Sequence, residues 1–118
     1  MKTKIYQVEK AINYAKKWVY GRNPLYYNFD SLGGDCTNFV SQCIYAGCET
    51  MNYQPNGWYY TSLNNRSPAW TGVEFLYNFL INNDGIGPTA TNVNKENISL
   101  GDIVQLGNST NNFYHTCL

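Results

Sequence analysis

A chain of 118 residues is expected to form one domain with a substantial core and no room for a second domain. Eight lysines and arginines balance eight aspartates and glutamates. This zero formal charge argues against a nucleic-acid-binding protein, which would present a basic face. Aromatic residues make up 16% of the chain and charged residues 14%, so any binding site is expected to rely on hydrogen bonding and stacking. No apolar run approaches the length of a membrane span.

The first predicted element is an amphipathic helix over residues 5–20, because apolar residues recur along one stripe and polar residues lie outside it. The start of the chain leads directly into this helix, so we expect no signal peptide within this sequence. Residues 22–34 are predicted to form a loop, because it contains the breakers Asn23-Pro24 and Gly33-Gly34. Between these breakers lie three aromatic residues: Tyr26, Tyr27 and Phe29.

A second helix is predicted from Cys36 to about Gly47, since apolar residues recur at spacings of three and four. Asp35 stands at the N-cap position, where a carboxylate can accept hydrogen bonds from the N–H groups of the first turn. A cysteine at the first helical position feels the positive end of the helix dipole, which favours thiolate over thiol. Cys36 therefore suits a nucleophile. The alternative is a structural cysteine, because cysteines often simply fill buried space.

The other cysteines are Cys43, Cys48 and Cys117. The chain has no C-x-x-C pair, so neither a zinc ribbon nor a thioredoxin-like motif is indicated. We expect free thiols, although a disulfide from Cys117 to Cys43 or Cys48 stays open. A zinc site of Cys36, Cys117 and His115 would have too few ligands at the wrong spacing, so we expect no metal and no other cofactor.

Residues 49–70 are predicted to form a long irregular loop rich in aromatic side chains, and loops of that length are usually functional. Trp58, Tyr59 and Trp70 are our candidates for stacking on a substrate, and the alternative for each is packing over the core. The T-x-x-E pattern of residues 71–74 predicts a capping box that opens a third helix, which ends at residues 82–85.

Two short strands are predicted at the end of the chain, over residues 103–106 and 113–118, with a hairpin loop between them. The second strand carries His115, the one histidine of the chain. A cysteine on a helix and a histidine on a sheet suffice for acyl transfer, because the imidazole takes the thiol proton and the ion pair keeps the thiolate populated. The alternative for His115 is a structural or exposed histidine. The N–H of Cys36 is a candidate donor to an oxyanion.

The run of residues 33–43, GGDCTNFVSQC, followed by Ala46-Gly47, resembles the signature of the bacterial putative amidase domain, a branch of the papain-like NlpC/P60 and CHAP group. The resemblance covers nearly the whole chain. It implies an α+β fold in which N-terminal helices, including the cysteine helix, pack on a small antiparallel sheet. It further implies the following site residues: Cys36 as nucleophile, His115 as base, Asp35 as support of the helix start, and Tyr26 or Tyr27 as lining.

The substrate implied by the resemblance is a peptide or amide bond, most naturally in cell-wall peptidoglycan. The resemblance therefore implies that this protein is secreted or associated with the cell wall of a Gram-positive-type bacterium. No nucleic acid and no membrane span are expected.

One departure from the family pattern concerns the third polar residue, which in this group lies on a strand after the histidine and orients the imidazole. This chain ends three residues after His115, so we expect residues 1–118 to be a papain-like domain with an incomplete sheet. Asp102, Asn111 or Asn112 are candidates to replace the missing residue. Two explanations stay open: the sequence is truncated, or a second copy supplies the missing edge. An unpaired strand edge is a template for another chain, so the second explanation corresponds to a homodimer through pairing or exchange of the C-terminal strand.

The competing interpretation is a binding module on the same scaffold, without catalysis, in which the aromatic loop recognises glycan or peptide. Thiol reactivity separates the two, because a binding module has no reason to keep Cys36 ionised.

Overall fold

The computed structural model describes residues 6–29, 35–92, 104–107 and 113–117, the last two ranges by their backbone alone. These residues form four helices and four short strands, which confirms the predicted α+β class. In chain order the elements are α1 (Val8–Trp18), α2 (Cys36–Cys48), β1 (Tyr60–Ser62), β2 (Asn65–Arg66), α3 (Pro68–Thr71), α4 (Val73–Asn82), β3 (Val104–Gly107) and β4 (Phe113–Cys117).

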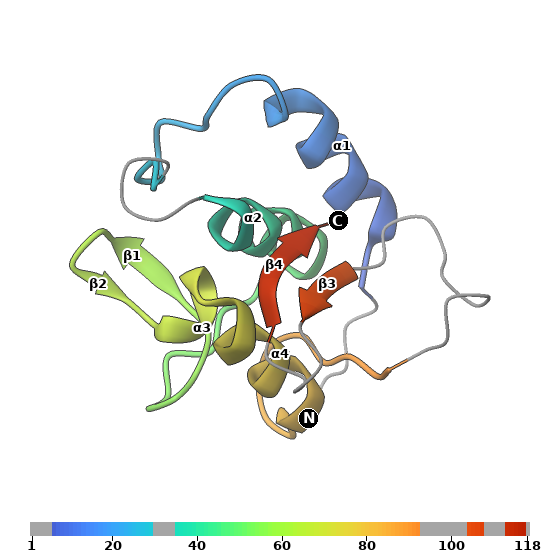
Figure 1. Ribbon diagram of the computed structural model, residues 1–118, viewed down its shortest axis with the longest axis vertical. Helices are drawn as coiled ribbons and strands as arrows, with labels where there is room; N and C mark the ends of the chain where they lie inside the picture. The colour runs from blue at the N-terminus through green and yellow to red at the C-terminus, as the bar shows by residue number, and fades with distance from the viewer. Residues whose placement is uncertain (1–5, 30–34, 93–103, 108–112, 118) are drawn as a thin grey trace.

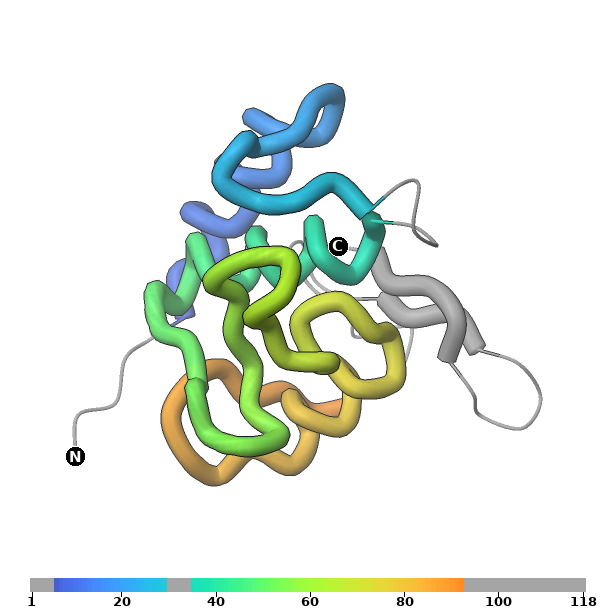
Figure 2. The backbone as a smooth tube through the Cα atoms, turned by 90° about the vertical axis from the view of Figure 1, so that its left-hand side faces the viewer, coloured from blue at the N-terminus to red at the C-terminus, as the bar shows by residue number. Residues whose placement is uncertain are grey.

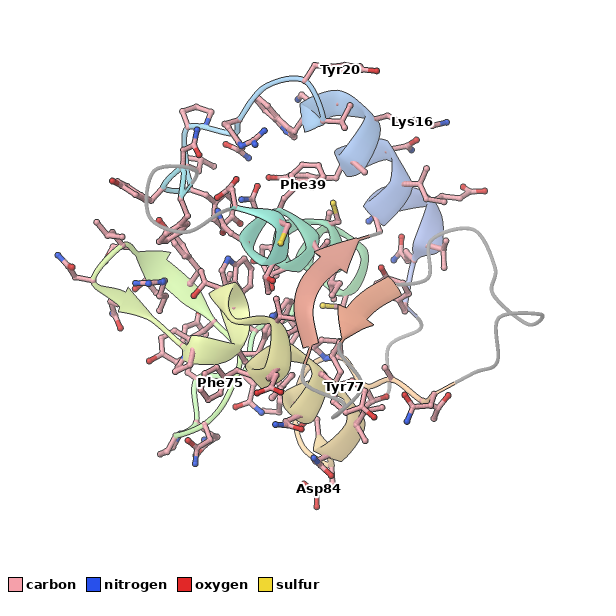
Figure 3. All side chains as sticks on the ribbon, in the orientation of Figure 1. Lys16, Tyr20, Phe39, Phe75, Tyr77 and Asp84 are labelled. Atoms are coloured by element: carbon pink, nitrogen blue, oxygen red, sulfur yellow. The ribbon has the colours of Figure 1, made fainter. Side chains whose placement is uncertain are left out.

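Helix α2 is the central element. Helix α1 packs along one side of it, α3 packs on another side, and β4 lies against both α2 and α4 (Figure 1). A view turned by a quarter turn also places α2 between α1 and the layer formed by α3 and α4 (Figure 2). Phe39 points from α2 toward α1 (Figure 3), where its ring centroid lies 6.4 Å from that of Tyr14. The element that carries Cys36 is therefore held from several sides.

The described strands form two separate antiparallel pairs, β1 with β2 and β3 with β4. In the second pair Val104 lies opposite Cys117 and Leu106 lies opposite His115. The sequence predicted this C-terminal hairpin, and the backbone confirms it. The sequence did not predict the first pair, in which Tyr60 lies opposite Arg66.

The core is mostly aromatic and fills the space between α2, α3, α4 and the β1–β2 hairpin. Trp58 and Trp70 are both fully buried, with ring centroids 4.7 Å apart. Phe79 stacks on Trp58 at 6.2 Å. Burying a large apolar side chain contributes about 1.5–3 kcal/mol, and a well-placed aromatic pair adds about 0.5–1.5 kcal/mol. The two indoles therefore make a large contribution to the packing of this small domain.

The predicted capping box at residues 71–74 is wrong, although the helix that it announced is present. Pro68 starts the short helix α3 one turn earlier, so Thr71 is already helical, and the N–H of Gly72 donates to the carbonyl of Pro68 at 2.8 Å. Gly72 is the N-cap of α4, which has no side-chain cap. The helix ends at Asn82, the first residue of the Asn-Asn-Asp-Gly run that predicted its end.

Gly47 was expected to end α2, but the helix continues to Cys48 and closes on Glu49, whose φ of 59° is left-handed. The backbone N–H of Gln7 donates to the carbonyl of Gly47 at 2.9 Å. A Cβ at Gly47 would lie 2.5 Å from the ring of Tyr6. This glycine therefore permits the close approach of the segment that leads into α1.

Candidate active site

Cys36 is the first residue of α2 and is partly exposed to solvent. Its thiol is free, and its Sγ lies 3.8 Å from the Oγ1 of Thr37. The first helical hydrogen bond runs from the N–H of Phe39 to the carbonyl of Asp35 at 2.9 Å. The N–H groups that precede it, beginning with that of Cys36, have no acceptor within the helix. The sulfur thus lies at the electropositive end of α2.

The other two cysteines of α2 lie in different surroundings. Cys43 is completely buried, and burial raises the pKa of its thiol from 9.0 to about 12. Its thiol therefore stays protonated at neutral pH and is unreactive. Cys48 is partly buried, and its thiol donates to the carbonyl of Thr50 at 3.4 Å. Of these three, Cys36 combines a helix N-terminus with access to solvent.

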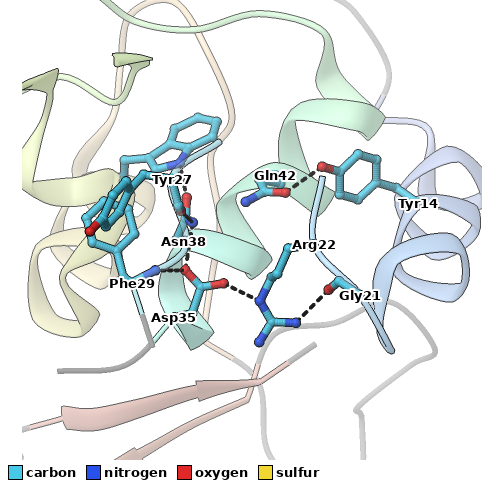
Figure 4. A network of polar contacts seen from close by, with 9 residues as sticks. Tyr14, Gly21, Arg22, Tyr27, Phe29, Asp35, Asn38 and Gln42 are labelled. Carbon is cyan, nitrogen blue, oxygen red and sulfur yellow. Dashed lines mark hydrogen bonds and ion pairs between the residues drawn. The ribbon is translucent and has the colours of Figure 1, made fainter. Parts of the chain in front are cut away.

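Asp35 holds the start of α2 in a way the sequence did not predict. It occupies the N-cap position, but its side chain makes no capping hydrogen bond to the backbone N–H groups of the first turn. Its Oδ1 instead accepts from the N–H of Phe29 at 2.9 Å and from the amide of Asn38 at 2.8 Å (Figure 4). Its Oδ2 forms an ion pair with the Nε of Arg22 at 2.8 Å. The carboxylate therefore ties the preceding loop to the helix rather than capping the helix.

Two polar side chains of α2 attach the helix to the aromatic core. The Oδ1 of Asn38 accepts from the indole of Trp70 at 2.8 Å, and its amide also donates to the carbonyl of Tyr27 at 2.9 Å. The hydroxyl of Ser41 donates to the carbonyl of Trp70 at 2.8 Å and accepts from the indole of Trp58 at 3.1 Å. Both polar residues are buried, and these bonds satisfy them.

The predicted substrate contacts of Trp58 and Trp70 are wrong, because both indoles are completely buried and hydrogen-bonded to α2. They belong to the core, which was the alternative considered for them. Tyr59 is partly exposed, and its ring centroid lies 5.4 Å from that of Tyr53, which is 64% exposed. A substrate contact through Tyr59 stays a prediction.

Tyr26 and Tyr27 lie in the segment between α1 and α2. The ring of Tyr26 stacks on Trp70 at 5.9 Å, and burial raises the pKa of its hydroxyl above the ordinary 10.0. The N–H of Tyr27 donates to the hydroxyl of Tyr60 at 2.8 Å, while its side chain is 39% exposed. Tyr26 thus supports the core beneath the site, and Tyr27 retains an exposed ring beside the same loop.

Strand β4, which carries His115, packs against α2. This brings the two predicted catalytic residues onto neighbouring elements. The side chains of His115 and Cys117 lie outside the described residues, as do Asp102, Asn111 and Asn112. The contact between Cys36 and His115 stays a prediction. Within the described part of the chain, no three His, Cys, Asp or Glu side chains come together to hold a metal ion, and no helix is long and apolar enough to cross a membrane.

Sequence reasoning missed Arg22, Asn38 and Ser41 as supporting residues. The sequence contained a signal for Asn38 and Ser41, because they lie three residues apart on one predicted helix and are separated by apolar residues. Polar residues on a buried helical face require partners, and indole N–H groups are donors in need of an acceptor. The sequence contained no pattern that pairs Arg22 with Asp35, which lies thirteen residues later.

Comparison with known proteins shows the family to which the chain belongs. The profile of the putative amidase domain family matches residues 5–118. The chain belongs to this family. It is also 36% identical over 98 residues to the uncharacterized protein YhbB of Bacillus subtilis (strain 168). That match covers 80% of this chain and 30% of the relative, so this amidase-family chain spans less than a third of that protein. No solved structure matches the chain.

Proposed function

We propose that this chain is a cysteine amidase that hydrolyses amide bonds by nucleophilic acyl transfer, with Cys36 as the nucleophile and His115 as the base. The observation that carries the proposal is the placement of Cys36: a free, partly exposed thiol at the N-terminus of α2, with β4 packed against the same helix. Membership of an amidase family supports the reaction class. A helix bearing the cysteine and a strand bearing the histidine also suit the papain-like arrangement that the sequence resembles.

In the proposed reaction, the imidazole of His115 accepts the thiol proton of Cys36. The thiolate attacks the carbonyl carbon of the substrate amide, a C–S bond forms, and the carbonyl oxygen takes up the negative charge. The imidazolium then gives its proton to the leaving nitrogen as the C–N bond breaks. Water, deprotonated by His115, attacks the resulting thioester. This second step releases the carboxylic acid product and restores the thiol.

The oxyanion formed during each attack needs hydrogen-bond donors, and the N-terminus of α2 supplies candidates. Cys36 is the first residue of α2, so its backbone N–H has no acceptor within the helix and can donate to a substrate oxygen. A donor fixed in a helix needs no reorganisation when charge develops on the substrate oxygen. We propose that the N–H of Cys36 contributes to this oxyanion hole.

The proposed substrate is an amide bond of cell-wall peptidoglycan, and the proposed location is outside the cell or in its wall. The resemblance of residues 33–43 to the NlpC/P60 and CHAP group supports both proposals. The surface agrees with a substrate bound through stacking and hydrogen bonds, because large aromatic side chains stay exposed at Tyr27 and Tyr53. Pairing of the C-terminal strand with a second copy is also proposed, and light scattering would detect the dimer.

The test is the rate of alkylation of each cysteine as a function of pH, measured by peptide mass mapping in the parent protein and in His115→Ala. We expect Cys36 to react quickly well below the roughly 8.5 of a free thiol, and to lose this reactivity in His115→Ala. Cys43 serves as a buried internal control. A Cys36 that titrates as an ordinary thiol in the parent would contradict the amidase proposal.

A second candidate function is a binding module without catalysis, and the Tyr53–Tyr59 pair favours it. These rings lie 5.4 Å apart on the surface and offer faces to a sugar or peptide. Binding of soluble peptidoglycan fragments that is lost in Tyr53→Ala, together with an unreactive Cys36, would support this function over the amidase.

A further inference from the structure

Asp35, a carboxylate at the N-cap of α2, is the residue directly before the proposed nucleophile. The side chain of Asp35 is 2% exposed, so solvent screens its charge poorly. A negative charge beside a thiol disfavours the thiolate that the proposed reaction requires. Asp35 nevertheless holds the loop to the helix through the Phe29 N–H and the Asn38 amide. A reactive Cys36 therefore needs a cation that balances Asp35 without removing it.

Arg22 is placed to supply that charge. Its Nε lies 2.8 Å from the Oδ2 of Asp35, and its Nη1 donates to the carbonyl of Gly21 at 2.6 Å (Figure 4). The guanidinium stays charged at every pH at which the protein is folded. Its side chain is 36% exposed, so one side of the cation remains in contact with water while the other faces the buried carboxylate.

We propose that Arg22 is a positioning residue for the Cys36 site: it neutralises the buried Asp35 carboxylate and so lets Cys36 carry a thiolate at the start of α2. This inference rests on the proposed function, because it explains how that nucleophile is sustained. Arg22 reaches the site from the loop after α1, so the N-terminal helix also contributes to the reactivity of a thiol on α2.

A purely structural role for the same ion pair is the competing explanation, and charge variants separate the two. In Arg22→Gln the carboxylate loses its cation. In Asp35→Asn the cation loses its carboxylate, while the amide oxygen can still accept from Phe29 and Asn38. In the double variant both charges are gone. A structural role predicts weaker folding in each variant, whereas an electrostatic role predicts opposite effects of the two single changes.

The experiment measures the alkylation rate of Cys36 by iodoacetamide against pH in the parent protein, both single variants and the double variant. Relative to the parent, we expect the half-maximal rate to move about one pH unit upward in Arg22→Gln and downward in Asp35→Asn. The double variant should return toward the parent profile. Lys10→Gln is the matched control, because Lys10 pairs with Glu49 beyond the other end of α2, and its profile should equal the parent's.

Two results would overturn the inference. One is a pH profile that does not change in Arg22→Gln, and the other is a shift in the same direction in both single variants. Near-UV circular dichroism checks that each variant is folded. If Arg22→Gln fails to fold, Asp35→Asn and the double variant still show in which direction each charge shifts the pH profile of Cys36 alkylation. If Cys36 of the parent is alkylated as slowly as an ordinary thiol, the proposed function itself is contradicted. If Cys36 is alkylated quickly and its pH profile does not depend on Arg22, only this inference is contradicted.

Discussion

The two ends of α2 each hold an ion pair with the N-terminal segment, and the two pairs differ in their surroundings. At the C-terminal end Lys10 pairs with Glu49 at 2.9 Å, and both side chains are 50% exposed. At the N-terminal end Arg22 pairs with Asp35 at 2.8 Å, and the carboxylate is 2% exposed. The distances are nearly equal, so solvent access rather than geometry distinguishes the pairs.

The difference in solvent exposure indicates which of the two ion pairs matters more for stability. An exposed pair contributes about 0–1 kcal/mol, because water and salt screen it. A buried carboxylate must be paired and hydrogen-bonded, since an uncompensated buried charge costs several kcal/mol. The buried pair lies next to Cys36, and the exposed pair lies at the opposite end of α2. The interactions at the N-terminal end of α2 are therefore expected to contribute more to stability than those at its C-terminal end.

The largest expected effect compares the cysteines at the two ends of α2. Cys36→Ala should reduce amide hydrolysis by at least about 10³-fold, because it removes the attacking sulfur. Cys48→Ala should retain activity and lose only stability. Turnover of a peptidoglycan-derived peptide by both variants, each first checked for folding, measures the difference. Full activity in Cys36→Ala would show that the two cysteines do not differ in function and would contradict the proposed mechanism.

The next effect compares the two carboxylates through stability. Asp35→Ala should lower the free energy of unfolding by about 3 kcal/mol, because it removes the acceptor of the Phe29 N–H and one of the two acceptors of the Asn38 amide. Glu49→Ala should change it by less than about 0.5 kcal/mol. Urea denaturation gives both values. Equal losses in the two variants would show that burial does not distinguish the pairs.

The middle of α2 supplies a pH-dependent prediction. The pKa of Cys43 is about 12 in the folded protein against an ordinary 9.0, so above pH 9 the unfolded chain releases this proton while the folded one keeps it. Stability should therefore fall with rising pH, by about 1 kcal/mol between pH 9 and pH 10 from this thiol.

Urea denaturation at pH 8, 9 and 10 measures this loss, with Cys43→Ala as the control that should lose less over the same range. Tyr14 and Tyr26 also have raised pKa values, so their contributions begin mainly above their ordinary 10.0. A parent and a Cys43→Ala protein with the same slope would exclude the thiol as the cause.

The smallest effect concerns the exposed pair alone. Lys10→Met should lower the free energy of unfolding by less than about 0.5 kcal/mol at low salt, and the difference should disappear in 1 M NaCl. Denaturation at two ionic strengths is the measurement. A loss above 1 kcal/mol that persists in salt would show that the C-terminal end of α2 is held as firmly as the N-terminal end.

The sequence predicted the elements whose signals are local. Apolar periodicity located α1, α2 and α4, and a short apolar run next to turn residues located the C-terminal hairpin. It did not predict the β1–β2 hairpin or the helical turn of α3, because short elements there depend on packing around the buried Trp58 and Trp70. The capping box failed for a related reason, since Pro68 began a helical turn that already included Thr71.

The candidate site was predictable where a local rule applied and unpredictable where a distant partner decided the outcome. The glycines, Asp35 and the helix pattern indicated that Cys36 begins a helix. No local rule shows that Asp35 would pair with Arg22 or that Asn38 would accept from Trp70, because these partners lie 13 and 32 residues apart in the sequence. Aromatic residues in a polar loop likewise give no sign of which rings are buried.

The attachment of α2 to Trp58 and Trp70 gives the protein a built-in optical reporter. Two indoles in close contact and fixed by hydrogen bonds to Ser41 and Asn38 sit in an asymmetric environment, which produces near-ultraviolet circular dichroism only while side-chain packing is intact. If α2 moved away from the core, both indoles would lose their acceptors and gain water. The docking of the helix that carries Cys36 can thus be followed in solution by near-ultraviolet circular dichroism, without a label on the thiol.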